Sequence, residues 1–299
     1  MRFADIGQQL RAYRLESGLR ADEIAARLGV SRAALYRYEK GEVIKLDTVR
    51  RLAELLKVSP LSLLGIGVEY YSRAAGFQER LLQIEESADQ ILQVGGSVCY
   101  LTTSDAFDSV LTNAFAEFVQ ASAESERPTQ QAAMEQVVGL LNARKRVYAA
   151  RKPGIIAMLS SASIRRLLQD GLGGALPLSE HTREACRRLA QAEVENIATI
   201  MESEPMGLQF GLLPELAEQG GTFQMLRSRD RATLAVNPFP PDLPPNAQLA
   251  VAIITSAEDA IAAHQRVAEA AWREAVKGSA AAARVRQMLA SARSPAHQE

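Results

Sequence analysis

The sequence predicts a multi-domain protein with an all-α N-terminal domain of five helices, a linker helix, and a C-terminal α/β (or α+β) domain. Residues 1–66 show apolar residues at helical spacing, and residues 67–94 carry a seven-residue apolar repeat. From residue 95 to 299, short apolar runs alternate with amphipathic stretches, which is typical of layered α/β domains. The length of 299 residues also favours more than one domain.

The distribution of charge also separates the N-terminal domain from the rest of the chain. The sequence is 47% hydrophobic and 23% charged, which excludes a disordered polyelectrolyte. Its formal net charge is only −1, but residues 1–64 hold 12 Lys and Arg against 8 Asp and Glu, whereas the remainder holds 22 against 27. We therefore expect the N-terminal domain, and not the acidic remainder, to meet a polyanion.

The sequence favours a cytoplasmic protein. Cys99 and Cys186 lie far apart in apolar surroundings, which is typical of free thiols in a reducing compartment. The N-terminus carries no apolar stretch of signal-peptide length, and no uncharged apolar run approaches the roughly 20 residues of a membrane span. We expect no membrane partner.

The first 64 residues read as five short helices with clear boundaries. Gly18, Gly29 and Gly41 stand where the first three helices end, and Pro60 opens the last one. Ser31 is a favourable N-cap for the third helix.

The second and third helices, joined at Gly29, make a helix-turn-helix. The major groove of B-form DNA is about 12 Å wide and admits one α-helix, whose outer face must carry groups that contact bases. On the third helix that face holds four residues, Arg32, Ala33, Tyr36 and Arg37. Arginine can bind guanine through two hydrogen bonds, and alanine or tyrosine carbons can contact thymine methyl groups. These four are the candidate base-reading residues.

The spacing of Leu10, Arg14, Gly18, Ala25, Gly29, Ser31, Glu39 and Gly41, together with the closing LLKVSPLSLL, resembles the phage-repressor or XRE family of regulators. The resemblance implies a recognition helix from Ser31 to Lys40. It also implies phosphate contacts from Arg20, Ser31, Lys40 and Lys45, and a buried ion pair between Arg14 and Glu39. The loop EVIKLD after Gly41 lacks the proline that family members usually carry there.

Two interpretations of this domain remain open. It can be a protein-contact module that has kept the fold without DNA binding, and Glu42 fits that alternative. The outward arginines and the nearby lysines favour double-stranded DNA. One short helix provides only about 1–3 kcal/mol per base contact, so such proteins usually bind two half-sites as dimers.

Residues 67–94 are predicted to form the linker and dimerisation helix. Their apolar residues follow a strict seven-residue repeat, which suits a helix packed against a partner helix. The residues at this seam include Tyr70, Phe77, Leu81, Ile84 and Ile91. The alternative is a core helix of the second domain, and Gly76 argues against a long isolated coiled coil.

The C-terminal domain is predicted from its alternating pattern. The expected strands are 97–103, 154–160, 207–213 and 247–256, with a hairpin at 222–239; the expected helices are 105–121, 129–149, 162–170, 179–203, 257–276 and 278–292.

Hydroxyl pairs follow three of these strands, each just before a helix begins. They are Thr103, Ser104, Ser160, Ser161, Thr255 and Ser256. Pockets in α/β domains form at the carboxyl ends of strands, and free amides at a helix start favour anions. These residues are therefore candidates for binding a carboxylate- or phosphate-bearing effector, with plain N-capping as the alternative.

No catalytic residue, metal site or cofactor is predicted. His181, His264 and His297 show no metal-ligand spacing, and neither a nucleophile elbow nor a phosphate-binding loop motif occurs. We expect a transcription regulator that is at least dimeric and is controlled by a metabolite in a sensor-like C-terminal domain. The alternatives are a C-terminal domain that binds another protein without any small ligand, and an enzyme fused to the DNA-binding head.

Overall fold

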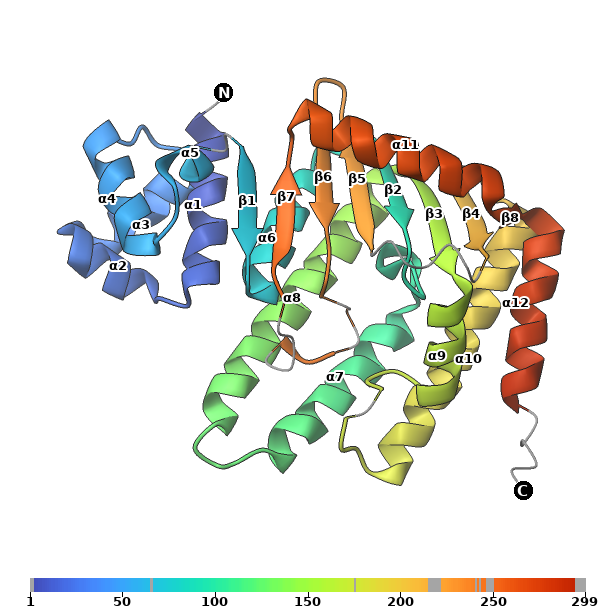
Figure 1. Cartoon of the computed structure of the whole chain (residues 1–299). Coiled ribbons are helices and arrows are strands. Elements are labelled where there is room, and N and C mark those ends of the chain that lie inside the picture. Colours follow the sequence, from blue (N-terminus) through green and yellow to red (C-terminus); the bar gives the residue numbers. More distant parts are fainter. Residues whose placement is uncertain are drawn as a thin grey trace.

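The chain forms a small helical unit beside a larger layered unit built on a single sheet (Figure 1). This computed structural model describes residues 3–64, 67–174, 176–214, 222–239, 241, 243–245 and 250–293. Within them, no helix has both the length and the apolar character needed to cross a membrane.

The N-terminal unit contains the five expected helices. They are α1 (Phe3–Ser17), α2 (Ala21–Leu28), α3 (Arg32–Glu39), α4 (Leu46–Leu56) and α5 (Pro60–Leu63). Each helix contributes at least one fully buried aliphatic side chain to a shared core: Leu10, Ile24, Leu35, Leu52 and Leu63. Burial of these side chains, rather than the helix propensity of such short segments, holds the unit together.

Two glycines fix how α3 sits in this unit. Gly29 ends α2 with φ of +71°, a left-handed conformation that lets the chain turn directly into α3. Gly7 lies where α1 passes the end of α3, and a Cβ added there would come within 2.5 Å of the Tyr38 carbonyl oxygen. The close approach of α1 and α3 therefore requires glycine at position 7.

The prediction of a linker and dimerisation helix over 67–94 is wrong. The segment forms strand β1 (Val68–Tyr71), helix α6 (Ala74–Glu85) and strand β2 (Gln90–Val94), so the sheet domain begins near residue 68 and not at 95. The apolar repeat therefore spans three separate elements, and its members do not all face the core. Of the five seam residues, Phe77, Leu81 and Ile91 are buried in the chain's own core, Ile84 is partly buried and Tyr70 is exposed on β1.

Eight strands form one mixed sheet in the order β1-β7-β6-β5-β2-β3-β4-β8. The remaining strands are β3 (Gly154–Ser160), β4 (Leu208–Leu213), β5 (Phe223–Arg227), β6 (Ala232–Val236), β7 (Ala252–Thr255) and β8 (Val276–Lys277). Strands β2, β3 and β4 run parallel, and all other neighbours are antiparallel. Of the strand predicted over 247–256, β7 covers Ala252–Thr255; residues 250, 251 and 256 are not in a strand, and residues 247–249 lie outside the described part of the chain.

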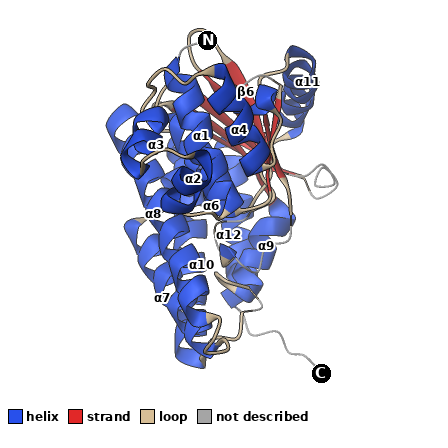
Figure 2. Ribbon diagram, turned by 90° about the vertical axis from the view of Figure 1, so that its left-hand side faces the viewer, coloured by secondary structure: helices blue, strands red, loops and turns tan. Residues whose placement is uncertain are grey.

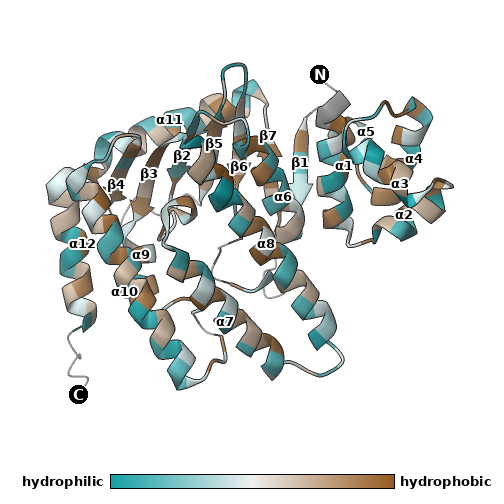
Figure 3. Cartoon of the chain, turned by 180° about the vertical axis from the view of Figure 1, so that it is seen from behind, coloured by the Kyte–Doolittle hydropathy of each residue, from teal (hydrophilic) through white to brown (hydrophobic). Residues whose placement is uncertain are grey.

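Helices cover both faces of the sheet. Helix α11 (Glu258–Glu274) crosses one face alone, while the opposite layer holds α6, α7 (Asp105–Ala121), α8 (Arg127–Arg151), α9 (Ser161–Asp170), α10 (Glu180–Ser203) and α12 (Gly278–Arg293) (Figures 1 and 2). The strands are largely hydrophobic, whereas the helices alternate between hydrophobic and hydrophilic positions (Figure 3). This pattern matches a core between the layers.

One predicted strand is absent. Residues 97–103 form a loop and the short 3-10 helix η1 (Tyr100–Thr102). The strand parallel to β3 is β2 instead, and Gly95 and Gly96, with φ of +87° and +85°, turn the chain away from the sheet before Cys99.

The helical unit is joined to the sheet domain by α1, which packs along α6. Glu16 of α1 accepts hydrogen bonds from the backbone amides of Ser72 (2.5 Å) and Arg73 (2.9 Å), just before α6 begins. A carboxylate at this end of a helix is favoured by the helix dipole. Gly76 permits the contact, because an added Cβ would lie 2.9 Å from the Cβ of Glu16.

A buried polar cluster completes this joint. Glu69 of β1 accepts hydrogen bonds from Gln9 Nε2 (2.7 Å), Tyr71 Oη (2.7 Å) and Arg80 Nε (2.9 Å). The rings of Tyr13 and Tyr71 stack with centroids 5.4 Å apart. The helical unit is thus held against the sheet edge by specific contacts rather than by a flexible tether.

Candidate nucleic-acid interface

Helix α3 turns the predicted base-reading residues away from the core. Arg32, Ala33 and Arg37 are exposed and Tyr36 is half-buried, whereas Leu35 between them is fully buried. Positions i, i+1, i+4 and i+5 lie on one side of a helix, so the four side chains share one surface. The structure brings them together as the sequence analysis expected.

Arg32 and Tyr36 form one unit on this surface. The Nη2 and Nε atoms of Arg32 donate to the Tyr36 hydroxyl oxygen at 3.1 and 3.3 Å. The Arg32 guanidinium carbon also lies 5.4 Å from the centre of the tyrosine ring. The hydrogen bond to Tyr36 raises the pKa of Arg32. The pairing orients the guanidinium without burying it, which leaves its other N–H groups available to a base edge or a phosphate.

Arg37 is held by a weaker contact. Its Nε lies 3.3 Å from Glu42 Oε2, and the two side chains are 62% and 52% exposed. Ion pairs this exposed contribute only about 0–1 kcal/mol. Arg37 can therefore exchange Glu42 for a nucleic-acid partner at small cost.

The four predicted phosphate contacts all lie at helix ends and are exposed. Arg20 is the N-cap of α2, Ser31 of α3 and Lys45 of α4, while Lys40 follows the last turn of α3. The Ser31 hydroxyl accepts from the Ala34 amide at 3.1 Å and keeps its own proton free to donate. Helix N-termini present free amides and a positive dipole end, so three of these positions suit phosphate groups.

The ion pair between Arg14 and Glu39 is present. Arg14 Nε donates to Glu39 Oε1 at 2.6 Å and Nη2 donates to Oε2 at 3.1 Å, with the side chains 14% and 6% exposed. This two-pronged contact ties α1 to the last turn of α3. It fixes the orientation of the helix that carries the base-reading residues.

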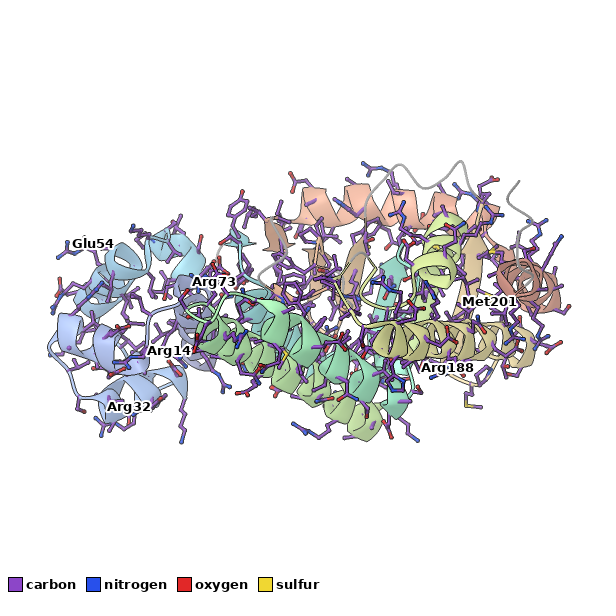
Figure 4. All side chains as sticks on the ribbon, turned by 90° about the horizontal axis from the view of Figure 1, so that it is seen from below. Arg14, Arg32, Glu54, Arg73, Arg188 and Met201 are labelled. Atoms are coloured by element: carbon purple, nitrogen blue, oxygen red, sulfur yellow. The ribbon has the colours of Figure 1, made fainter. Side chains whose placement is uncertain are left out.

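A cleft of about 830 Å³ lies between α2 and α3 on one side and α8 on the other. Four arginines and one carboxylate line it; of the arginines, Arg14 is paired with Glu39 and Arg20 with Asp22, which leaves the side chains of Arg32 and Arg73 without a carboxylate partner among the described residues. The lining residues of α8 are uncharged, namely Thr129, Ala132, Ala133, Gln136 and Val137. Figure 4 shows Arg14 and Arg73 where the two domains meet and Arg32 farther out on the helical unit. The sheet domain thus places no acidic side chain of the cleft lining opposite the basic surface.

The six hydroxyl residues predicted for an effector do not form one site. Thr103 and Ser104 follow η1 and not a strand, so their placement at a strand end was wrong. Strand β7 runs opposite to β3, which puts Thr255 and Ser256 at the other end of the sheet from Ser160.

Local hydrogen bonds account for these hydroxyls. Ser160 Oγ accepts from the Ser163 amide at 3.0 Å and caps α9. Ser161 Oγ donates to the Leu213 carbonyl at 2.6 Å. Thr255 Oγ1 accepts from the Ala257 amide at 3.1 Å. Of the remaining three, Thr103 donates to the Tyr100 carbonyl, Ser104 bonds to Glu193, and Ser256 lies 3.4 Å from Thr233 Oγ1. Of the six, Ser160 caps a helix as the alternative predicted, and the others bond to backbone or side-chain groups within the chain.

Sequence reasoning missed the residues that position the helical unit. Glu16, Glu69 and Gly7 carry no motif, because their partners are distant in sequence or are backbone atoms. Over the described residues, no three His, Cys, Asp or Glu side chains gather in a way that could hold a metal ion. His264 bonds to the Ala260 carbonyl at 2.8 Å, and His297 lies outside the described residues.

Comparison with known families matches residues 5–64 to the helix-turn-helix domain. No curated protein and no solved structure matches the chain. The matched range covers α1 from residue 5 onward, all of α2 to α5, and every residue predicted to contact DNA. Residues 5–64 are therefore a helix-turn-helix domain, which implies that the chain binds DNA.

Proposed function

We propose that the protein is a sequence-specific transcription regulator of phage-repressor type that binds double-stranded DNA as a dimer and responds to a small metabolite. The single observation that carries the proposal is the exposed side of α3, where Arg32, Tyr36 and Arg37 project from a helix-turn-helix domain. A helix with this surface fits the major groove, and its arginines match the acceptors of guanine.

Electrostatics supports the same surface. The basic cleft beside α3 and the exposed residues at the helix ends supply positive groups on either side of the base-reading residues. Phosphate contacts of this kind hold a protein in register on the duplex, while base contacts supply specificity. The sheet domain is the remaining candidate for effector binding.

Dimer formation is proposed on energetic grounds. The α3 surface offers two arginines and a tyrosine, and each good base contact discriminates by only about 1–3 kcal/mol. Two copies on half-sites one helical turn apart double the readout. Because Phe77, Leu81 and Ile91 pack in the chain's own core, the predicted helical seam over residues 67–94 is not the contact between copies that we propose.

The test is selection of duplexes from a random library with the full chain, followed by fluorescence anisotropy on the selected site. Arg37→Ala is expected to weaken the selected site by about 1–3 kcal/mol and non-specific duplex much less. Arg188→Ala on α10, 61% exposed and far from α3 (Figure 4), is the matched control and should change neither affinity. Equal losses on every duplex would contradict base reading by Arg37, and failure to retain any duplex would overturn the proposed function.

A further inference from the structure

A second cleft, of about 600 Å³, opens at the carboxyl ends of the parallel strands β2 and β3. It is bounded by Gln78 of α6, Arg144 of α8, Leu167 of α9 and Gln224 of β5. Ligands of α/β domains bind at this end of parallel strands, in pockets of about 300–1,000 Å³. None of the six hydroxyl residues discussed above lines it.

Three buried glutamines line this cleft. Gln78, Gln93 and Gln224 come from three different elements and are each at most 8% exposed. Gln93 Nε2 donates to the carbonyls of Gly95 and Val98, both at 3.0 Å, so its Oε1 must accept from Gln224 Nε2 at 3.3 Å. That orientation leaves Gln224 Oε1 as a buried acceptor without a hydrogen-bond partner among the residues described. Buried polar atoms are nearly always paired, so this acceptor points to a missing donor.

The buried arginine of the cleft is already neutralised. Arg144 Nε and Nη2 donate to the two carboxylate oxygens of Glu85 at 2.9 and 2.6 Å, and its Nη1 donates to Gln78 Oε1 at 2.6 Å. Arg144 therefore shapes the wall and orients Gln78. It does not supply an unpaired charge to a ligand.

Two unpaired charges of opposite sign lie elsewhere on the lining. Arg166 and Asp170 stand one turn apart on α9, both exposed, and neither has a hydrogen-bond or ion-pair partner among the described residues. The remaining wall includes the apolar residues Val98, Leu167 and Phe239 beside polar ones such as Ser97 and Asn237, and Gly174 leaves open space next to it.

We propose that this cleft binds a small zwitterion of the amino-acid type, either a free amino acid or a dipeptide. The carboxylate of the ligand binds the Arg166 guanidinium, its ammonium group faces Asp170, and an N–H donor reaches Gln224 Oε1. The apolar part of the wall, at Val98, Leu167 and Phe239, accommodates the ligand's side chain. The inference rests on the proposed function, in which this ligand is the effector.

The experiment measures the melting temperature of the full chain against each free amino acid and a set of dipeptides, followed by calorimetry of the best probe. A ligand that prefers the folded state raises the melting temperature with its concentration. Arg166→Gln and Asp170→Asn are each expected to weaken the best probe by about tenfold or more, since each removes a charge-assisted hydrogen bond. Gln169→Ala, exposed on the same helix but outside this cleft, is the matched control.

The outcomes separate this inference from the proposed function. The variants should bind the selected duplex like the wild-type chain when no probe is present, because α9 lies in the sheet domain. If the wild-type chain binds duplex but no amino acid or dipeptide, the inference is wrong and the effector function passes to another surface or to a protein partner. Binding that Arg166→Gln leaves unchanged also overturns it, as does an Arg166-dependent response only to nucleotides or dicarboxylates.

Discussion

Replacing Glu69 by alanine should strongly destabilise the joint between the DNA-binding domain and the sheet. Glu69 and Arg80 form an ion pair at 2.9 Å in which both side chains are only 8% exposed. Gln9 of α1 donates to the same carboxylate, so the pair also connects the two domains. Removing the carboxylate leaves the Arg80 guanidinium buried without an opposite charge.

The expected loss of unfolding free energy is about 3–5 kcal/mol, the range for breaking a buried ion pair at one partner. The hydrogen bonds from Gln9 and Tyr71 do not add in full, because both groups can turn toward other partners or water. An exposed ion pair provides the comparison for this loss of unfolding free energy. Arg50 and Glu54 are 61% and 63% exposed, so Glu54→Ala should cost only about 0.3–0.5 kcal/mol.

Urea unfolding followed by circular dichroism measures both variants, and limited proteolysis near residue 67 reports on the joint. The double variant Glu69→Ala/Arg80→Met is the decisive control. It should be more stable than Glu69→Ala alone, because the uncompensated charge has gone and the methionine still fills the space. A single variant that loses under about 1 kcal/mol, or a double variant less stable than the single, would refute the assignment of an uncompensated buried charge.

Three further outcomes are expected from exposed or tightly packed positions. Gly7→Ala should lower the melting temperature of the helix-turn-helix domain because its Cβ collides with the backbone of α3, whereas Gly139→Ala, in an open helical position of α8, should gain about 0.5–1 kcal/mol in thermal melts. Glu42→Ala should tighten duplex binding by a few-fold at low salt, with the gain shrinking as salt rises, since it frees the neighbouring arginine of α3 and removes a negative charge. Hydrogen bonds from Thr182 and from the backbone at the start of α10 lower the pKa of Glu117, so the stability it provides is complete above its unfolded pKa of about 4.3 and is lost as pH falls through the lower folded value. Acid titration of unfolding should therefore be less steep below about pH 4.3 in Glu117→Gln than in the wild-type chain.

The N-terminal domain could be predicted in detail because its information is local. Helix caps such as Ser31, glycine stops such as Gly29, and the apolar spacing of each short helix all act within a few residues. The outward side of α3 followed from helical geometry alone. Strands β3 and β4, the hairpin and the long helices of the second domain were predicted for the same reason.

The rest depends on pairings across the chain that no local pattern records. Residues 68–94 read as one heptad helix because a two-residue strand period and a helical period both place apolar residues near positions 70, 77, 84 and 91. Turns around Ser72 and Ser87 break the segment into a strand, a helix and a second strand. These turns are stabilised by Glu16 and by the sheet. The placement of the six candidate effector hydroxyls depends on topology in the same way: β7 runs opposite to β3, and Ser160 is bonded as the N-cap of α9.

Helix α6 is the element through which the two clefts can influence each other. Two consecutive residues of α6 contact different neighbours. Gln78 lines the cleft at β2 and β3. Glu79, whose side chain is only 3% exposed, forms an ion pair with Arg11 of α1 at 3.0 Å. A ligand that pulls on Gln78 therefore acts on a helix that the DNA-binding domain is bound to, provided its affinity differs between the two positions of that helix.

This coupling predicts a change in hydrogen exchange at a distance. Gln78→Ala deprives the buried Arg144 of one partner and loosens α6, so amides of α1 should exchange faster although no contact of α1 has been removed. Ser97→Ala, on the wall of the same cleft but outside α6, should leave α1 unchanged. Equal protection of α1 in the two variants would mean that α6 does not transmit strain. Under the proposed function, an effector would then have to act on the helix-turn-helix domain through the proposed contact between copies.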